Sequence, residues 1–314
     1  MLLIDFLLIA LGVLGLYVGG EFLVRNASRL AKAKGMSPLV VGLTVVAFGT
    51  SSPELATTLT AAVEGSPGAA LGNVIGSNSA NLGLVLGLAA LLYPLGTSVR
   101  FLRQEVPFMI GTGVLLVALL ANGTLGRAAG LFLVLLLGAY LWALLRGGTA
   151  EAEEPEEQEQ ADDGDSNPIG VSLAGVALGV VLLVAGAYAL VEGALDLARA
   201  FEVPERVIGL TLVAVGGSLP ELGGTLVAAL RRQGGIVLGN LVGSNVFNVL
   251  FVLGITALVR PLSVSPGAFT LDLVVMLALS LMALPLLLTG RRLGRREGAL
   301  LLGVYLAYVG FLYA

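Results

Sequence analysis

The two halves of the chain repeat each other at a constant offset. Adding 167 to a position between 42 and 87 gives its counterpart between 209 and 254, and more than half of the aligned positions are identical without a gap. The same offset aligns 49–54 (GTSSPE) with 216–221 (GGSLPE), and 72–81 (GNVIGSNSAN) with 239–248 (GNLVGSNVFN). The chain is therefore expected to contain two copies of one structural unit.

Each unit consists mainly of apolar runs that are long enough to cross a bilayer. Hydrophobic residues make up 57% of the 314 residues, charged residues make up 12%, and the mean hydropathy is +0.96. The first run is long enough to span, so we interpret it as a membrane helix rather than a cleaved signal peptide. The sequence predicts an all-α polytopic membrane protein with ten transmembrane helices, at roughly 2–24, 37–63, 67–96, 106–121, 124–145, 169–198, 205–230, 234–259, 268–289 and 297–314.

The basic residues give these spans a direction. Cytoplasmic loops of membrane proteins carry an excess of Lys and Arg. One set of alternate loops holds thirteen of the seventeen basic residues, which places both termini outside, at the extracellular or periplasmic face of a cell (inner) membrane. The thirteen are Arg25, Arg29, Lys32, Lys34, Arg100, Arg103, Arg146, Arg231, Arg232, Arg291, Arg292, Arg295 and Arg296, and the other four are Arg127, Arg199, Arg206 and Arg260.

Five spans per unit is an odd number, so the second unit enters the membrane inverted. This predicts a first repeat at 1–146, a cytoplasmic linker at 147–168 and a second repeat at 169–314, with the second and seventh helices broken. Residues 151–165 of the linker hold nine acids and no base, which is typical of a solvated linker and leaves a cation-attracting or regulatory role open. Inverted repeats are typical of secondary transporters. A channel or a structural membrane protein remains an alternative.

A proline interrupts the helix in each hexamer. Because proline lacks an N–H and clashes with the carbonyl four residues earlier, Pro53 and Pro220 are expected to break their helices. The carbonyls of about 47–51 and 214–218 should then lose their helical partners. An unpaired carbonyl is costly in hydrocarbon, so a desolvated cation is one partner that these groups could take.

Glu54 and Glu221 are the acids that lie deepest in the predicted spans. No Lys or Arg is placed to pair with them, and a lone carboxylate in the membrane needs a proton or a cation. If the two carboxylates meet at the repeat interface, one divalent or two monovalent cations would neutralise them. The alternative is a pair of protonated glutamates that hydrogen-bond helices together.

Neutral oxygen donors follow each hexamer. Ser77 and Asn81, and likewise Ser244 and Asn248, stand four residues apart, so each pair lies on one helix face. The glycines of the same segments, Gly72, Gly76, Gly239 and Gly243, are interpreted as sites of close helix packing. Cysteine and histidine are absent, which excludes thiolate and imidazole chemistry and leaves oxygen ligands for hard cations.

These motifs closely resemble the α-repeats of the sodium/calcium exchanger family, within the cation/Ca²⁺ antiporter superfamily. The resemblance covers residues 37–90 and 204–257, and elsewhere it rests on span number and topology. It implies a core of eight helices against which the first and sixth helices slide. It also implies that Ca²⁺ is held by Glu54 and Glu221 with help from the carbonyls of Thr50 and Gly217. Na⁺ is implied to compete around Ala47, Ser51, Ser77, Asn81, Ala214, Ser218, Ser244 and Asn248.

Two positions depart from the family pattern. Gly217 stands where the hexamer often has Thr, but the position is thought to contribute its carbonyl, so function is expected to survive. Asn248 stands where some relatives have Asp, which leaves two formal charges at the site and is consistent with electrogenic exchange. Asn at both Asn81 and Asn248 also argues against K⁺ co-transport.

The leading hypothesis is a Na⁺/Ca²⁺ antiporter that exports Ca²⁺ and uses no cofactor. The ions would be its substrates and the lipid bilayer its surroundings, nucleic acid has no role, and a monomer is expected to suffice. H⁺/Ca²⁺ exchange and K⁺-dependent exchange are close alternatives, and a passive cation channel is an alternative from another class. An enzyme is least expected, because G-x-S-x-G, His and Cys are all missing.

Overall fold

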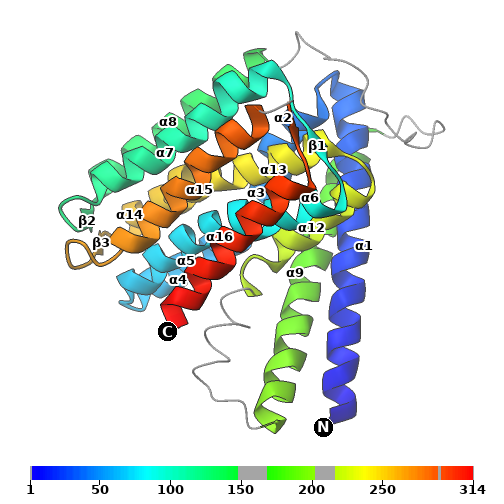
Figure 1. Ribbon diagram of the computed structural model, residues 1–314, viewed down its shortest axis with the longest axis horizontal. Coiled ribbons are helices and arrows are strands. Elements are labelled where there is room, and N and C mark those ends of the chain that lie inside the picture. Colours follow the sequence, from blue (N-terminus) through cyan, green and yellow to red (C-terminus); the bar gives the residue numbers. More distant parts are fainter. Residues whose placement is uncertain (1, 148–167, 202–215, 289–290, 314) are drawn as a thin grey trace.

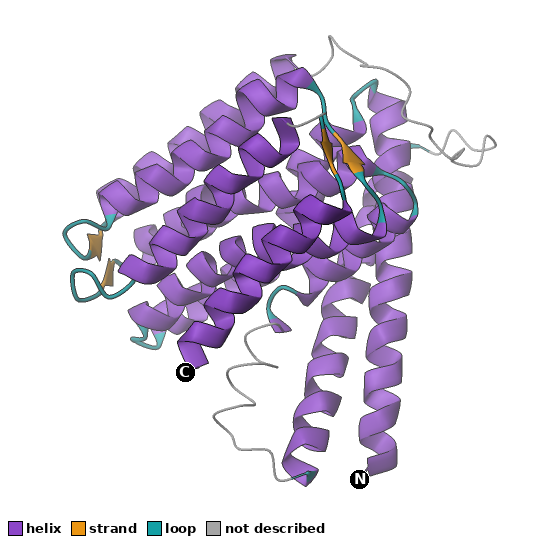
Figure 2. Cartoon of the chain, viewed as in Figure 1, coloured by secondary structure: helices purple, strands orange, loops and turns teal. Residues whose placement is uncertain are grey.

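The computed structural model describes residues 2–147, 168–201, 216–288 and 291–313. These residues form helices almost throughout, together with two short strand pairs, as Figures 1 and 2 show. Strand β1 (Leu95–Gly96) pairs antiparallel with β4 (Arg292–Leu293), and β2 (Thr124–Leu125) pairs antiparallel with β3 (Leu262–Ser263). Each pair joins a loop of the first half to a loop of the second.

Two long helices stand together at one side of the molecule (Figure 1). They are α1 (Leu2–Lys34) and α9 (Ile169–Ala200), and glycines line the seam between them. A Cβ on Gly15 would lie 2.9 Å from the Gly186 Cα, and a Cβ on Gly19 would lie 2.6 Å from the Leu183 nitrogen. Because the two backbones touch, α1 and α9 are packed as one unit.

The centre of the molecule is made by two matching helical spans. The first consists of α5 (Pro67–Ala80), η2 (Asn81–Val85) and α6 (Leu86–Leu92), and the second of α13 (Gly234–Phe247), η5 (Asn248–Val252) and α14 (Leu253–Val259). The most apolar window of each span is 78% buried, against 22–39% for the other five long spans. The G-N-x-x-G-S-N-x-x-N motifs therefore lie in the protein interior.

The remaining helices surround this centre. A bent span precedes α5 and consists of α2 (Pro38–Val41), η1 (Gly42–Val46), α3 (Ala47–Thr50) and α4 (Ser52–Val63). Its counterpart before α13 is described from Gly216 onward and contains α12 (Leu219–Leu230). The outer helices are η3 (Phe101–Glu105) with α7 (Val106–Leu119), α8 (Arg127–Gly147), α15 (Thr270–Leu288) and α16 (Arg295–Tyr313). Large apolar side chains such as Leu135 and Leu281 are exposed on them, as expected of a lipid-facing surface.

Seven described helices are long and apolar enough to cross a membrane, or eight if the bent pair Pro38–Thr50 and Ser52–Val63 counts as one span. The bend of 41° between these segments confirms the predicted break in the second helix. The seventh predicted span, 205–230, lies partly outside the described residues, and the acidic segment 151–165 lies wholly outside them. The tenth is α16, whose first turn carries Arg295, Arg296 and Glu297. A total of ten spans stays a prediction.

Four predicted boundaries are wrong. The third span ends at Leu92 rather than 96, and the fifth begins at Arg127 rather than 124, because Leu95–Gly96 and Thr124–Leu125 form strands β1 and β2. Helix α1 continues to Lys34 rather than ending near 24, because a helix does not need apolar residues once it leaves the membrane. Lys32 and Lys34 lie in the last turn of α1, where positive charges interact favourably with the negative end of the helix dipole. The fourth span begins at Phe101 rather than 106, because Phe101–Glu105 forms a π-helical turn that continues into α7. Such π-helical turns are often found at functional sites. Further described ones begin at Gly42, Asn81 and Asn248.

Candidate functional site

The first hexamer lies at the bend between α3 and α4. Helix α3 ends at Thr50, Ser51 has φ −82° and ψ 0°, and Pro53 occupies the first turn of α4, where its missing N–H costs no helical hydrogen bond. The prediction that all carbonyls of 47–51 lose their helical partners is wrong at both ends. The Ala47 carbonyl accepts from the Ser51 N–H at 3.0 Å, and the Ser51 carbonyl accepts from the Leu55 N–H at 3.2 Å. Between them, the Phe48 carbonyl accepts from the Ser52 hydroxyl at 2.7 Å, and Pro53 has no N–H to donate to the Gly49 carbonyl.

The second hexamer has the same relation to α12. This helix begins at Leu219, Pro220 lies in its first turn, and Gly216–Ser218 precede it. The Ser218 carbonyl keeps a helical partner, the Leu222 N–H at 2.9 Å, which corrects the expectation for this residue as well. Of the predicted site residues, Ala214 alone lies outside the described residues.

Glu54 and Glu221 occupy equivalent places in the first turns of α4 and α12. Their exposed fractions are 2% and 0%, and the two carboxyl groups are close enough to interact directly with each other. None of the four buried carboxylate oxygens makes a hydrogen bond of normal geometry to the described residues, although the Thr50 side chain lies close to Glu221. Two carboxylates cannot hydrogen-bond to each other without a proton. The positive ends of two helices offset part of the repulsion, and a cation would offset the rest.

Burial alone does not distinguish these glutamates, since two other acids of the described residues are also buried. Asp5 is 6% exposed and Glu105 is 5% exposed. Glu105 accepts a hydrogen bond from the Tyr140 hydroxyl at 2.6 Å, so its charge is compensated within the protein. The hexamer glutamates differ because they have each other and, among the described residues, no such hydrogen bond. Their environment is therefore unfavourable unless something else binds there.

Most of the unpaired buried polar atoms belong to predicted site residues. Ten buried side-chain N or O atoms of the described residues lack a hydrogen-bond partner, and seven of them belong to residues predicted to bind ions. The seven are both carboxylate oxygens of Glu54 and of Glu221, the Ser51 hydroxyl, and the amide oxygens of Asn81 and Asn248. Buried polar atoms of native proteins normally have partners, so this concentration indicates a site for a ligand.

Of the other predicted site residues, Ala47, Thr50, Ser77, Ser218 and Ser244 are buried, whereas Gly217 is exposed. The Thr50 hydroxyl donates to the Asn240 amide oxygen at 3.1 Å and lies 3.3 Å from the Ser244 hydroxyl. Because Thr50 has one hydroxyl proton, Ser244 is the donor in the second contact. Ala47 packs against Gly243 and the Leu39 carbonyl against Gly239, which confirms close packing at these two glycines. The same prediction is wrong at Gly76, where a Cβ would meet nothing within 4 Å among the described residues, and at Gly72 it would meet only the Phe269 ring, at 3.6 Å. Ser77 and Ser218 are 6% and 3% exposed, and within the described residues no hydrogen bond joins their side chains to the other site residues.

Gly217 leaves an open place where Thr50 has its side chain. An ideal Cβ on Gly217 would meet only the Asn73 amide oxygen within the described residues, at 3.8 Å. Asn73 is the repeat counterpart of Asn240, the residue that accepts from Thr50. The backbone of Gly217 also avoids the left-handed region. The departure from the family pattern thus removes a hydroxyl at this position.

Sequence reasoning missed a layer of polar residues behind the predicted ligands. Asn73 donates to the Thr58 hydroxyl at 3.0 Å, and its counterpart Asn240 donates to the Thr225 hydroxyl at 3.2 Å. Asn78 and Asn245 also hydrogen-bond across the centre of the molecule. All six residues are identities of the internal repeat, so the repeat was the signal that could have identified them.

Comparison with known proteins gives consistent results. The model of the family described as sodium/calcium exchanger protein matches residues 4–146 and 171–314. The chain is 36% identical to the inner membrane protein YrbG of Escherichia coli over 98% of this chain and 96% of that protein. It is 35% identical to the sodium/calcium exchanger MaX1 of Methanosarcina acetivorans, over 100% of this chain and 99% of that protein. It is also 35% identical to the putative antiporter CaxA of Alkalimonas amylolytica, over 99% and 98%.

Solved structures agree with these sequence relatives. The structure of the sodium-calcium exchanger NCX_Mj soaked with 2.5 mM Na⁺ and 0.1 mM Ca²⁺ superposes with a TM-score of 0.85. The two chains are 31% identical, and the match covers 99% of each. The chain is therefore a multi-pass membrane protein of the sodium/calcium exchanger family, whose members are cation/Ca²⁺ antiporters.

Proposed function

We propose that the protein exchanges Na⁺ for Ca²⁺ at one central site that opens alternately to the two faces of the membrane. The observation that carries this proposal is that seven of the ten buried polar atoms without hydrogen-bond partners in the described residues are oxygens of Glu54, Glu221, Ser51, Asn81 and Asn248. Two carboxylates and neutral oxygens are a ligand set for hard cations. One Ca²⁺ or two Na⁺ would neutralise the pair, so the ions compete for the same charge.

The ligands that we propose extend the seven oxygens to the rest of the site. Ca²⁺ is assigned to the two glutamates, with carbonyl contributions from Thr50 and Gly217. Na⁺ is assigned to oxygens of Ala47, Ser51, Ser77 and Asn81 and of their counterparts Ala214, Ser218, Ser244 and Asn248. Burial of those that are described supports the assignment, because an ion bound there would be shielded from water.

We assign the protein ten spans in two inverted repeats, with both termini outside a cell membrane and a monomer as the working unit. The family model matches one segment in each half, and equivalent asparagines of the two halves hydrogen-bond to each other. The backbone contact between α1 and α9 supports their movement as one unit against the other helices. That movement would expose the central site first to one side and then to the other.

A vesicle experiment tests the exchange. Purified protein in liposomes loaded with Na⁺ and diluted into Na⁺-free medium is expected to take up ⁴⁵Ca²⁺, and the uptake should collapse when the Na⁺ gradient is removed. An equal uptake driven by a pH gradient without Na⁺ would favour H⁺/Ca²⁺ exchange, for which the contact between two carboxyl groups is a specific argument. Uptake without any counter-ion would indicate a channel.

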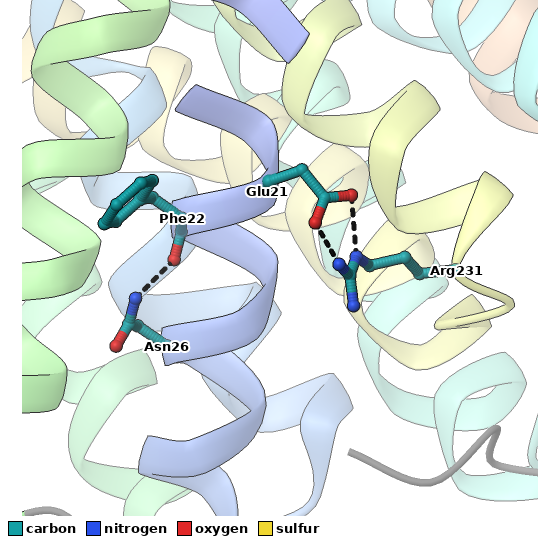
Figure 3. Close-up of polar contacts among 4 residues, drawn as sticks. All are labelled: Glu21, Phe22, Asn26 and Arg231. Carbon is teal, nitrogen blue, oxygen red and sulfur yellow. Dashed lines mark hydrogen bonds and ion pairs between the residues drawn. The ribbon is translucent and has the colours of Figure 1, made fainter. Parts of the chain in front are cut away.

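An ion pair joins the two parts that we propose to move. Arg231, at the end of α12, donates through its Nε to the Glu21 Oε1 on α1 at 2.7 Å, and a second guanidinium nitrogen contacts Oε2 (Figure 3). The repeat counterparts of Glu21 and Arg231 are Tyr188 and Glu64, which cannot form this pair. The contact therefore favours one arrangement of α1 over the other.

Glu21→Gln is expected to shift the balance between the two arrangements without abolishing exchange. An exposed ion pair is worth about 0.2–1 kcal/mol, which is a shift of up to about fivefold. The chain has no cysteine, so spin labels at Tyr188→Cys on α9 and Val274→Cys on α15 would report the distance between the two parts.

Asp196→Asn is the matched control, because the Asp196–Arg199 pair lies within α9 and does not join the moving parts. Its distance distribution should equal that of the parent protein. An unchanged distribution in Glu21→Gln would contradict the assigned role of the Glu21–Arg231 pair.

A further inference from the structure

Hydrogen bonds connect four asparagines at the centre of the molecule. They are Asn78, Asn81, Asn245 and Asn248, which we call the asparagine quartet, and each is at most 3% exposed. Asn78 and Asn81 belong to the first half, and Asn245 and Asn248 are their repeat counterparts. Asn81 and Asn248 begin the π-helical segments η2 and η5. The quartet thus includes two proposed ligands and two residues with no assigned role.

Backbone carbonyls fix the orientation of the Asn78 and Asn245 side chains. The Asn78 Nδ2 donates to the Asn245 carbonyl at 3.3 Å, and the Asn245 Nδ2 donates to the Asn78 carbonyl at 3.4 Å. A carbonyl only accepts hydrogen bonds, so the NH₂ end of each side-chain amide must be the end that faces it. The amide oxygens of Asn78 and Asn245 are thereby turned away from these carbonyls.

That orientation determines which way the side-chain amides of Asn81 and Asn248 are turned. The Asn78 Oδ1 accepts from the Asn248 Nδ2 at 3.0 Å, and the Asn245 Oδ1 accepts from the Asn81 Nδ2 at 3.1 Å. The NH₂ groups of Asn81 and Asn248 are therefore used inside the quartet. Their oxygens are left buried without a hydrogen-bond partner, among the unpaired oxygens of the site.

We infer that Asn78 and Asn245 are positioning residues that turn the amide oxygens of Asn248 and Asn81 toward the transported cation. The inference rests on the proposed exchange and adds two residues to its machinery. An amide that is free to rotate by half a turn presents NH₂, which repels a cation, as readily as oxygen. Hydrogen bonds behind a metal ligand commonly change metal affinity by about 10–100-fold, because they fix the orientation of that ligand.

Removing the acceptor on one side should impair the ligand that it orients. Asn78→Leu has a similar shape but cannot accept from Asn248, and Asn245→Leu cannot accept from Asn81. In each variant, we expect ⁴⁵Ca²⁺ to bind to purified protein about tenfold or more weakly. A carboxylate offers oxygen in either orientation, so an added Asn248→Asp should restore Ca²⁺ affinity in Asn78→Leu to that of Asn248→Asp alone.

The two halves of the quartet serve as controls for each other. Asn81→Asp should rescue Asn245→Leu but not Asn78→Leu, and Asn248→Asp should rescue Asn78→Leu but not Asn245→Leu. If the quartet only braced the two halves, either Asp substitution would act alike on both Leu variants, and that result would overturn the inference. Wild-type protein that binds no Ca²⁺ would overturn the exchange proposal and this inference with it.

A second variant avoids dependence on the folding of the Leu variants. Asn78→Asp keeps an oxygen that accepts from Asn248 while it changes the contact to the Asn245 carbonyl. We expect Ca²⁺ affinity within about threefold of wild type or tighter, even if the melting temperature falls, because the ligand stays oriented. A loss of Ca²⁺ affinity in proportion to the loss of stability would contradict a positioning role.

Discussion

Replacing Glu54 or Glu221 by glutamine is expected to abolish Na⁺-driven ⁴⁵Ca²⁺ uptake. Each substitution removes one of the two charges that face each other at the centre of the site. A divalent cation would then meet a single carboxylate inside the membrane. One carboxylate would not compensate for the hydration free energy that the cation loses. Because the two glutamates are repeat counterparts, either variant should fail alone.

Ca²⁺-dependent stabilisation separates loss of binding from loss of structure. A ligand at 100 times its dissociation constant stabilises a protein by about 2.7 kcal/mol, so wild type should melt at a higher temperature in Ca²⁺. The glutamine variants should lose this shift but keep a cooperative transition in its absence. Glu64→Gln is the control, because Glu64 is exposed at the end of the same helix as Glu54. Full uptake in Glu54→Gln or Glu221→Gln would contradict the proposed ligand role.

Much of the site could be predicted because the residue types alone indicate its chemistry. Glu54 and Glu221 stand in apolar runs without a basic partner, and no helix in lipid tolerates that without compensation. The amide oxygens of Asn81 and Asn248 followed from their spacing and from the repeat, and the Ser51 hydroxyl followed from the resemblance to the sodium/calcium exchanger family. The structure leaves these same atoms unpaired, which is the agreement expected if both observations reflect an ion site.

The features that could not be predicted depend on distances between segments far apart in the sequence. The orientation of the quartet is set by contacts between Asn78 and Asn245, 167 residues apart. No local pattern tells which end of an amide meets a carbonyl. The π-helical turns at Asn81 and Asn248 depend equally on packing, since the residues that form them have no distinct π-helical propensity. The error about the Ala47 carbonyl arose because Pro53 was placed within a helix rather than in the first turn of a new one.

Gly243→Ala is expected to damage the site without touching a proposed ligand side chain. A Cβ on Gly243 would lie 2.7 Å from the Ala47 Cβ and 2.9 Å from the Leu43 carbonyl oxygen, so the bent span must shift. Overpacking of this kind costs about 1–3 kcal/mol. Ala47 and Ser51 are joined by a backbone hydrogen bond, so the shift would be passed to the Ser51 hydroxyl and to Thr50. We expect Ca²⁺ affinity to fall about tenfold and the melting temperature to fall as well.

Gly138→Ala provides the comparison for the same chemical change. Gly138 lies inside α8 on an exposed face, and a Cβ there would meet nothing within 4 Å among the described residues. Because alanine favours a helix more than glycine does, this variant should keep wild-type Ca²⁺ affinity and be equal or higher in stability. Equal behaviour of the two variants would mean that α13 and the bent span are not held in the close contact on which the geometry of the site depends.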